Sequence, residues 1–130
     1  MDAGDRLDVT QDEGGIVEIS RDDREGVDVV RIGGEVDLTN ADAVQAAVEA
    51  TRSDAVVLDL TSVAYLDSSG IRAIDRSLRL LASEERSLVI VSPPDTPSSW
   101  IFRVAGFDGK LVVDSVEAAL ASTSRLDPPV

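Results

Sequence analysis

The segment Val-Ala-Tyr-Leu-Asp-Ser-Ser-Gly-Ile, residues 63–71, holds the side chains best placed for chemistry. It follows the apolar run 55–60 and precedes a segment whose apolar residues recur at helical spacing. Ser68 and Ser69 therefore lie at the first turn of a helix, where backbone N–H groups are free and the helix dipole is positive. A serine here can cap the helix, and it is also exposed enough to receive a phosphoryl group. Local chemistry alone favours the cap.

Two aspartates accompany these serines. Asp67 directly precedes Ser68, and its negative charge would stabilise the N-terminus of the helix. Asp37 ends the segment Gly-Glu-Val-Asp at residues 34–37, just before another predicted helix, and is typical of a turn or capping residue. On local grounds, neither carboxylate needs more than this structural role.

The composition limits the chemistry that the chain could perform. Because it has no cysteine and no histidine, it lacks disulfides, thiolate chemistry and the commonest general base and metal ligand. It contains no phosphate-binding or dinucleotide glycine motif, and no serine in a Gly-x-Ser-x-Gly elbow. A hydrolase or metal site built from carboxylates is the weaker alternative that remains. We expect no enzymatic activity and no cofactor.

The net charge of −13 over 130 residues is large for this size. It argues against binding to nucleic acid, which needs a positive surface, and against anionic membranes. It suits a basic protein partner, although acidity mostly serves solubility. No apolar run approaches the ~18 residues needed to span a bilayer, and the N-terminus has no signal-peptide pattern. We therefore expect a cytoplasmic protein.

Strands and helices alternate along the chain. A hairpin is predicted from strands over 16–20 and 27–32, joined by a polar turn over 21–26. The other predicted strands cover 55–60, 88–91 and 111–113, and the predicted helices begin near Asn40, Ser69, Pro97 and Asp114. These helices end near Thr51, Ala82, Ala105 and Ser122.

Apolar periodicity and capping residues add detail to the last two helices. Their predicted features are an inner face of Trp100, Ile101, Val104 and Ala105 on the third helix, and a capping box of Asp114 and Glu117 on the fourth.

The two acidic motifs together resemble the anti-sigma factor antagonist family, whose members are stand-alone STAS domains. In that family a Gly-Glu-(apolar)-Asp turn precedes the first helix, and Asp-Ser-(Ser/Thr)-Gly opens the second about thirty residues later. Residues 34–37 and 67–70 match both motifs in order and spacing. The resemblance covers roughly residues 14–122 and implies a single STAS-like α/β domain. We expect a mixed β-sheet of about five strands packed against about four helices.

The ends of the chain are predicted to lie outside this domain. Residues 1–13 are polar and acidic and are predicted to form a disordered tail, and residues 123–130 a C-terminal tail.

The resemblance also implies a regulatory cycle. The unphosphorylated chain would bind an anti-sigma factor that is also a serine kinase, and so free a sigma factor. The kinase would then phosphorylate Ser68, the first serine after Asp67, and a phosphatase would reverse the step. A phosphate adds about −1.5 to −2 charges, which would weaken the complex without refolding the domain. The residues placed on the partner-binding surface are Asp37, Asp67, Ser69, Gly70 and Arg72.

One residue departs from the family pattern. Where the family often has Gly-Leu-Gly, this chain has Gly70-Ile71-Arg72. Arg72 could pair with Asp67 or with a phosphate at Ser68, or it could narrow the choice of kinase.

The alternative function is a phosphorylation-independent STAS scaffold or ligand-binding module in a signalling or lipid-transport assembly. The serine would then be only a cap. In either case we expect a monomer or a weak dimer.

Overall fold

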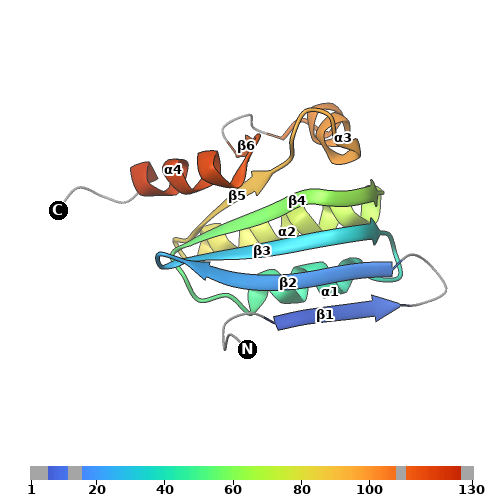
Figure 1. The fold of residues 1–130 in the computed structure, drawn as a ribbon, viewed down its shortest axis with the longest axis horizontal. Helices are drawn as coiled ribbons and strands as arrows, with labels where there is room; N and C mark the ends of the chain where they lie inside the picture. The colour runs from blue at the N-terminus through green and yellow to red at the C-terminus, as the bar shows by residue number, and fades with distance from the viewer. Residues whose placement is uncertain (1–5, 12–15, 108–110, 127–130) are drawn as a thin grey trace.

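A six-stranded mixed sheet runs through the centre of the molecule (Figure 1). The computed structural model describes residues 6–11, 16–107 and 111–126. The strands are β1 (Arg6–Gln11), β2 (Ile16–Arg24), β3 (Val27–Val36), β4 (Ala55–Leu66), β5 (Ser87–Val91) and β6 (Val112–Val113). They lie side by side in chain order, antiparallel from β1 to β3 and parallel from β3 to β6.

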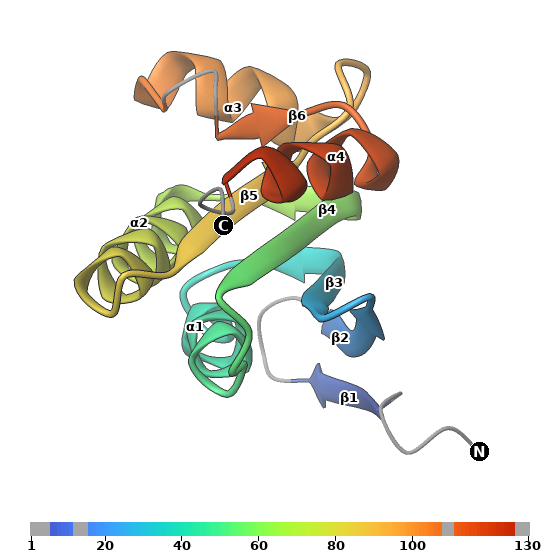
Figure 2. The same ribbon diagram turned by 90° about the vertical axis from the view of Figure 1, so that its left-hand side faces the viewer.

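Four helices flank this sheet. They are α1 (Ala41–Glu49), α2 (Ser68–Ser83), α3 (Pro97–Ala105) and α4 (Val116–Leu126). Figure 2 shows α1 and α2 on one face of the sheet and α4 on the other. The predicted α/β domain with a mixed sheet and about four helices is therefore confirmed, and β1 adds one strand to the expected number.

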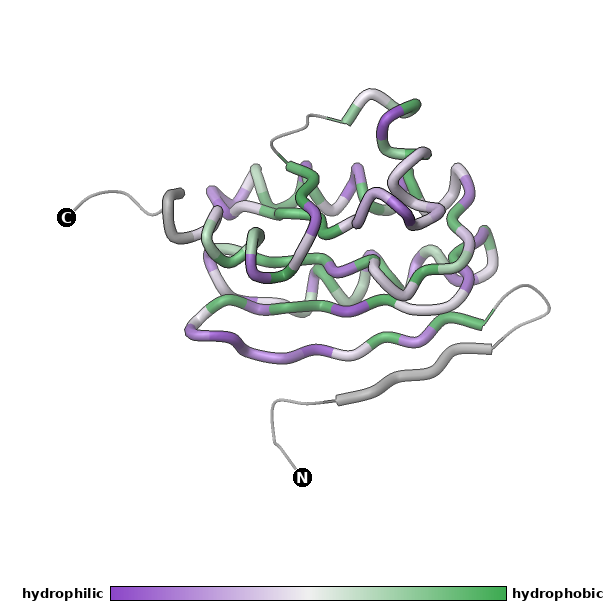
Figure 3. Tube along the Cα trace, turned by 45° about the horizontal axis from the view of Figure 1, so that its top comes forward, coloured by the Kyte–Doolittle hydropathy of each residue, from purple (hydrophilic) through white to green (hydrophobic). Residues whose placement is uncertain are grey.

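The core has one part on each face of the sheet. The larger part lies beneath α1, α2 and α3, and the smaller joins Val29, Val57 and Val89 to Ala119 of α4. Strands β4 and β5 are therefore buried on both faces, which is why residues 55–58 and 88–91 are continuous apolar runs instead of alternating ones. Figure 3 shows this contrast between the hydrophobic central strands and the hydrophilic β2–β3 hairpin.

The hairpin is tighter than the sequence predicted. The polar segment 21–24 continues β2, and only Glu25 and Gly26 form the turn, with φ of 57° and 85°. Two consecutive positive φ angles match the type I′ turn, whose twist suits paired strands. The prediction of a long turn failed because polar residues near a sheet edge can pair through their backbone while their side chains face water.

The chain ends also differ from the prediction. Residues 6–11, expected within a disordered acidic tail, form β1 and pair with β2 from Arg6↔Arg21 to Gln11↔Ile16. Without β1, the backbone groups of β2 would form an open sheet edge, and pairing satisfies them whatever the side chains are. At the other end, α4 runs to Leu126 because Thr123 is still buried against the domain. The rest of the two predicted tails lies outside the described residues.

The face of α3 was predicted wrongly except at Ile101, which is half-buried against the larger core. Trp100 and Val104 are 64% and 66% exposed, and the buried residues of this helix are Ser98 and Phe102. The Ser98 hydroxyl lies 2.7 Å from the hydroxyl of Ser92, which directly follows β5, so the first turn is fixed with Ser98 inward. Phe102 is four residues further along and therefore shares that face.

The cap of α4 also differs from the predicted capping box. The Ser115 hydroxyl accepts a hydrogen bond from the Ala118 N–H at 3.1 Å, so Ser115 takes the capping position expected for Asp114.

Candidate functional site

The two acidic motifs meet at one edge of the sheet. Val36 ends β3 and Leu66 ends β4, and these residues are partners in the parallel register between the strands. Asp37 and Asp67 therefore leave the sheet side by side, and the Asp67 N–H donates to the Val36 carbonyl at 3.2 Å. Strand β4 reaches this edge because it continues to Leu66, six residues beyond its predicted end.

Asp67, and not a serine, caps α2. Its Oδ1 accepts hydrogen bonds from the backbone N–H groups of Ser69 at 2.8 Å and Gly70 at 3.2 Å. The local expectation of a serine cap is therefore wrong. Ser68 is the first residue of the helix, its side chain is exposed, and its hydroxyl has no hydrogen-bond partner within the described ranges.

Gly70 lies beneath this surface. It is buried, and an added Cβ would lie 2.3 Å from Leu66 Cδ1 and 3.0 Å from Val36 Cγ1. A glycine is needed here because the first turn of α2 packs directly against the ends of β3 and β4. Gly70, placed on the partner-binding surface by the family resemblance, is therefore a packing residue, whereas Ser69 is half-buried at the surface.

The turn after β3 is braced by side-chain hydrogen bonds. Asp37 Oδ1 accepts from the Thr39 N–H at 2.9 Å and from the Thr39 hydroxyl, which confirms its predicted turn role. Asn40 is buried, accepts from the Asp37 N–H at 3.0 Å and donates to the Glu35 carbonyl at 2.8 Å. The sequence predicted only that a helix begins near Asn40. Its spacing of three residues after Asp37 was the available signal for this role.

Gly34 sets the path of the chain into this turn. Its φ is 85°, and an added Cβ would lie 2.2 Å from the carbonyl oxygen of Ile16 on the neighbouring strand. Both the backbone conformation and this close approach therefore require glycine. The register with β4 shifts directly after Gly34, so the bend re-aims the chain just before the Asp37 turn.

The charges around Ser68 are mostly negative. Glu35 is exposed, Asp37 and Asp67 are half-buried, and all three lie at this edge. Arg72 is exposed one helical turn after Ser68 on the same face of α2. Of the alternatives that the sequence left open for Arg72, pairing with Asp67 is absent, because Arg72 forms no ion pair with any residue that the structure describes.

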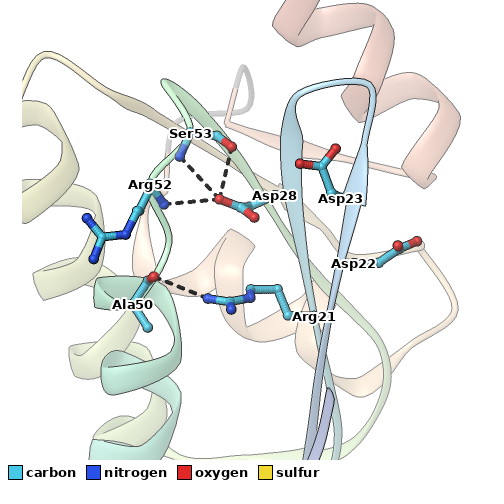
Figure 4. Close-up of a pocket in the computed structure, with 7 residues that line it drawn as sticks. All are labelled: Arg21, Asp22, Asp23, Asp28, Ala50, Arg52 and Ser53. Atoms are coloured by element: carbon cyan, nitrogen blue, oxygen red, sulfur yellow. Dashed lines mark hydrogen bonds between the residues drawn. The ribbon is translucent and has the colours of Figure 1, made fainter. Parts of the chain in front are cut away.

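A hollow of about 300 Å³ lies at the opposite edge of the sheet (Figure 4). Asp28 accepts there from the N–H groups of Arg52 and Ser53 and from the Ser53 hydroxyl. Burial raises the pKa of Asp28, but these hydrogen bonds and the charge of Arg21 outweigh it, so the pKa lies below its ordinary value of 3.8. The carboxylate holds the start of β3 to the α1–β4 loop, so its role is structural.

Residues 6–11, 16–107 and 111–126 contain no group of three side chains suited to hold a metal ion. None of the helices in these ranges has the length and apolar character needed to cross a bilayer.

Residues 18–120 match the model of the STAS domain. The chain belongs to the STAS domain family. No curated protein sequence shows a significant match to it.

Three solved structures share the STAS fold with this chain. An anti-sigma factor antagonist from Mycobacterium paratuberculosis is 24% identical, with a TM-score of 0.75 over 83% of this chain and 94% of that one. The Bacillus cell fate determinant SpoIIAA in its phosphorylated form is 17% identical, with a TM-score of 0.63 over 84% and 99%. A sulfate transporter family protein from Wolinella succinogenes is 17% identical, with a TM-score of 0.64 over 79% and 88%.

Proposed function

We propose that this STAS domain is an anti-sigma factor antagonist. In its unphosphorylated form it binds an anti-sigma factor with serine-kinase activity, which releases a sigma factor in the cytoplasm. The observation that carries the proposal is the exposed Ser68 hydroxyl. It is not used to cap α2, because Asp67 caps that helix. Likeness to an anti-sigma factor antagonist and to phosphorylated SpoIIAA supports it.

The kinase ends the interaction by modifying Ser68. The Ser68 oxygen attacks the γ-phosphorus of ATP held by the kinase, and a new O–P bond forms as the bond to the leaving oxygen of ADP breaks. The hydroxyl proton passes to a base on the kinase. This chain supplies the acceptor and its position, and a phosphatase later returns the hydroxyl by hydrolysis.

The phosphate acts through local charge. It adds about −1.5 to −2 charges directly beside Asp67 and at the edge that also holds Asp37. The positive end of the α2 dipole accommodates an anion, so the domain stays folded. A partner surface shaped for a small hydroxyl beside these carboxylates instead meets a bulky anion, and the complex dissociates.

Phosphopeptide mapping tests the proposal. The chain is incubated with ATP and, in turn, with a panel of anti-sigma factor kinases, and is then digested and analysed by mass spectrometry. We expect one phosphate, on Ser68, that Ser68→Ala abolishes and Ser69→Ala retains. Modification confined to Ser69, or no modification by any kinase that binds the chain, would refute the assignment.

A phosphorylation-independent role is the second candidate, because the chain also shares its fold with a sulfate transporter family protein. In that case it would serve as a scaffold or ligand-binding module in a larger assembly. Co-purification separates the two functions: recovery of a kinase-type anti-sigma factor supports the first, and recovery of transport subunits supports the second.

A further inference from the structure

One half of the sheet has an uncovered face. Helix α4 packs over β4, β5 and β6, on the face opposite α1 and α2 (Figure 2). On that side α4 reaches only the start of β3, at Val27 and Val29, and no helix of the described part of the chain lies over β2 or the rest of β3. The end of this open face adjoins the edge of the sheet where Ser68 lies.

Three residues form a row across this end. Val17 pairs with Gly34, which places Ile16 beside Glu35, and Glu35 in turn pairs with Tyr65. The next residues along each strand are Val17, Val36 and Leu66, and all three are buried in the larger core. Because successive strand side chains point to opposite faces, Ile16, Glu35 and Tyr65 point to the open face. We call these three residues the edge row.

The edge row is apolar at both of its ends and exposed. Ile16 is 46% and Tyr65 is 51% exposed, and Leu38, in the turn directly after Asp37, is 79% exposed. A single exposed apolar side chain is ordinary on a protein surface. Here three of them lie close, in sequence or in strand register, to the sheet edge that holds Asp37, Asp67 and Ser68, which we call the acceptor edge. Tyr65 is only three residues before Ser68.

A hollow of about 210 Å³ lies beside the edge row. It forms where Glu18, Gly33 and Ser62 pair across the strands, because Gly33 has no side chain to fill it. Asp59 also lines the hollow, and Arg31 lies 3.8 Å from the Asp59 carboxylate. The lining therefore contains two carboxylates, of Glu18 and Asp59, and one guanidinium, of Arg31. Its net negative charge suits a cationic side chain.

We propose that the edge row, Leu38 and the adjoining hollow form the part of the kinase-binding surface that sets the orientation of the anti-sigma factor. This inference rests on the proposed function. The occupant is a protein surface with an apolar pocket for Tyr65 and Leu38 and a lysine or arginine that enters the hollow beside Glu18. The anti-sigma factor thus extends from Ser68 over the open face of the sheet, and not over α3.

Several features favour this occupant. The patch formed by the edge row, Leu38 and the hollow is continuous with the acceptor edge. It combines apolar side chains with acidic ones. Tyrosine is also among the residues that most often dominate binding energies at interfaces. The side chains of α3 provide a matched comparison, since Trp100 and Val104 are as exposed as Tyr65 and Leu38 but lie on another element.

Calorimetry with two double variants tests the inference. The probe is the anti-sigma factor kinase that phosphorylates Ser68, mixed with unphosphorylated chain. We expect Leu38→Ser with Tyr65→Ser to raise Kd at least tenfold, and Trp100→Ser with Val104→Ser to change it less than twofold. Circular dichroism checks that each variant is folded. Equal affinities of the two variants, or a larger loss from the α3 pair, would overturn the inference while leaving phosphorylation of Ser68 intact.

Charge reversal tests the hollow in the same assay. Glu18→Lys should weaken binding about tenfold at low salt and less at high salt, because salt screens exposed charges. Glu117→Lys on α4 makes the same change in charge away from the patch and should have little effect. Equal losses from both variants would mean that only net charge matters.

Two further outcomes identify another occupant or a failure of the premise. If sedimentation shows a dimer of the wild-type chain that the Leu38 and Tyr65 variant loses, the patch binds a second copy and the inference is wrong. If no kinase binds the wild-type chain, the proposed function fails, and the inference fails with it.

Discussion

Asp67 caps the helix that Ser68 begins. Because the Asp67 carboxylate accepts from the two backbone N–H groups that follow Ser68, the fold does not depend on the Ser68 hydroxyl. The residue that holds the helix and the residue proposed to carry the signal are therefore adjacent but separate, and substitutions can test them one at a time.

Stability measurements should separate these two roles. We expect Ser68→Ala to change the free energy of unfolding by less than about 0.5 kcal/mol, as for an ordinary surface position. Asp67→Ala removes the cap and should cost about 1 kcal/mol. Urea denaturation of both variants checks this, and a loss in Ser68→Ala as large as that in Asp67→Ala would mean that the hydroxyl takes part in capping.

Charge at position 68 should control binding. Ser68→Ala should bind the anti-sigma factor kinase normally and resist inactivation by ATP. Ser68→Asp and Ser68→Glu should weaken binding by at least about 1.4 kcal/mol, a factor of ten. Titration calorimetry provides the affinities, and unchanged binding by the folded acidic variants would contradict the proposed switch.

Substitutions of Asp37 and Asn40 should have opposite effects on two measured quantities, the affinity for the kinase and the stability of the fold. Asp37→Asn retains an oxygen that can accept from Thr39, so the turn should persist while affinity for the kinase falls by up to about 2–5 kcal/mol if the contact is buried. Asn40→Ala leaves the Asp37 N–H and the Glu35 carbonyl without their partner and should cost about 1–3 kcal/mol of stability. Equal destabilisation by both substitutions would show that the Asp37 charge is structural.

Gly70 should tolerate no larger side chain. An added methyl group would meet Leu66 and Val36 closer than atoms can approach, so α2 must shift. We expect Gly70→Ala to cost about 1–3 kcal/mol, as overpacking usually does. Thermal denaturation tests this, with Gly106→Ala as a comparison in which no atom lies within 4 Å of the added Cβ and any cost comes from the positive φ of 79°. Unchanged stability of Gly70→Ala would contradict the close packing.

The acid sensitivity of the fold should depend in part on Asp28. Its pKa is lower in the folded chain than the ordinary 3.8, so the ionised carboxylate stabilises the fold above pH 3.8. That stabilisation is lost as the pH falls through the lower, folded pKa. Asp28→Asn should therefore reduce stability at neutral pH and flatten its decline in acid, measured by urea denaturation between pH 7 and pH 2. A decline as steep as that of the wild type would exclude this role.

The sequence predicted the elements whose apolar spacing dictates their burial. Strands β4 and β5 and helix α2 are examples, because continuous apolar runs and a helical stripe leave little choice. Strand β1 escaped prediction because it lies in a polar, acidic stretch of the sequence, and its backbone pairing with β2 cannot be read from that composition. The orientation of α3 was not predicted because its apolar residues lie on several sides of this short helix, so their spacing does not select the buried face. The contact of Ser98 with Ser92 selects it.

At the site, the sequence located the motifs but not the roles within them. Asp67 and Ser68 are both good capping residues, and they are adjacent, so spacing alone could not assign the cap. How the two motifs come together is decided by the register of β3 and β4. It brings Asp37 beside Asp67 across about thirty intervening residues.

The position of Ser68 within a formed helix also limits how any enzyme can recognise it. Kinases that bind an extended peptide need a segment whose backbone is free, but the residues around Ser68 are already committed to β4, to the Asp67 cap and to α2. An enzyme acting here must accept a whole domain as its substrate. Its selectivity would then reside in a shape assembled from distant parts of the chain, and a synthetic peptide of residues 63–71 would be a poor substitute.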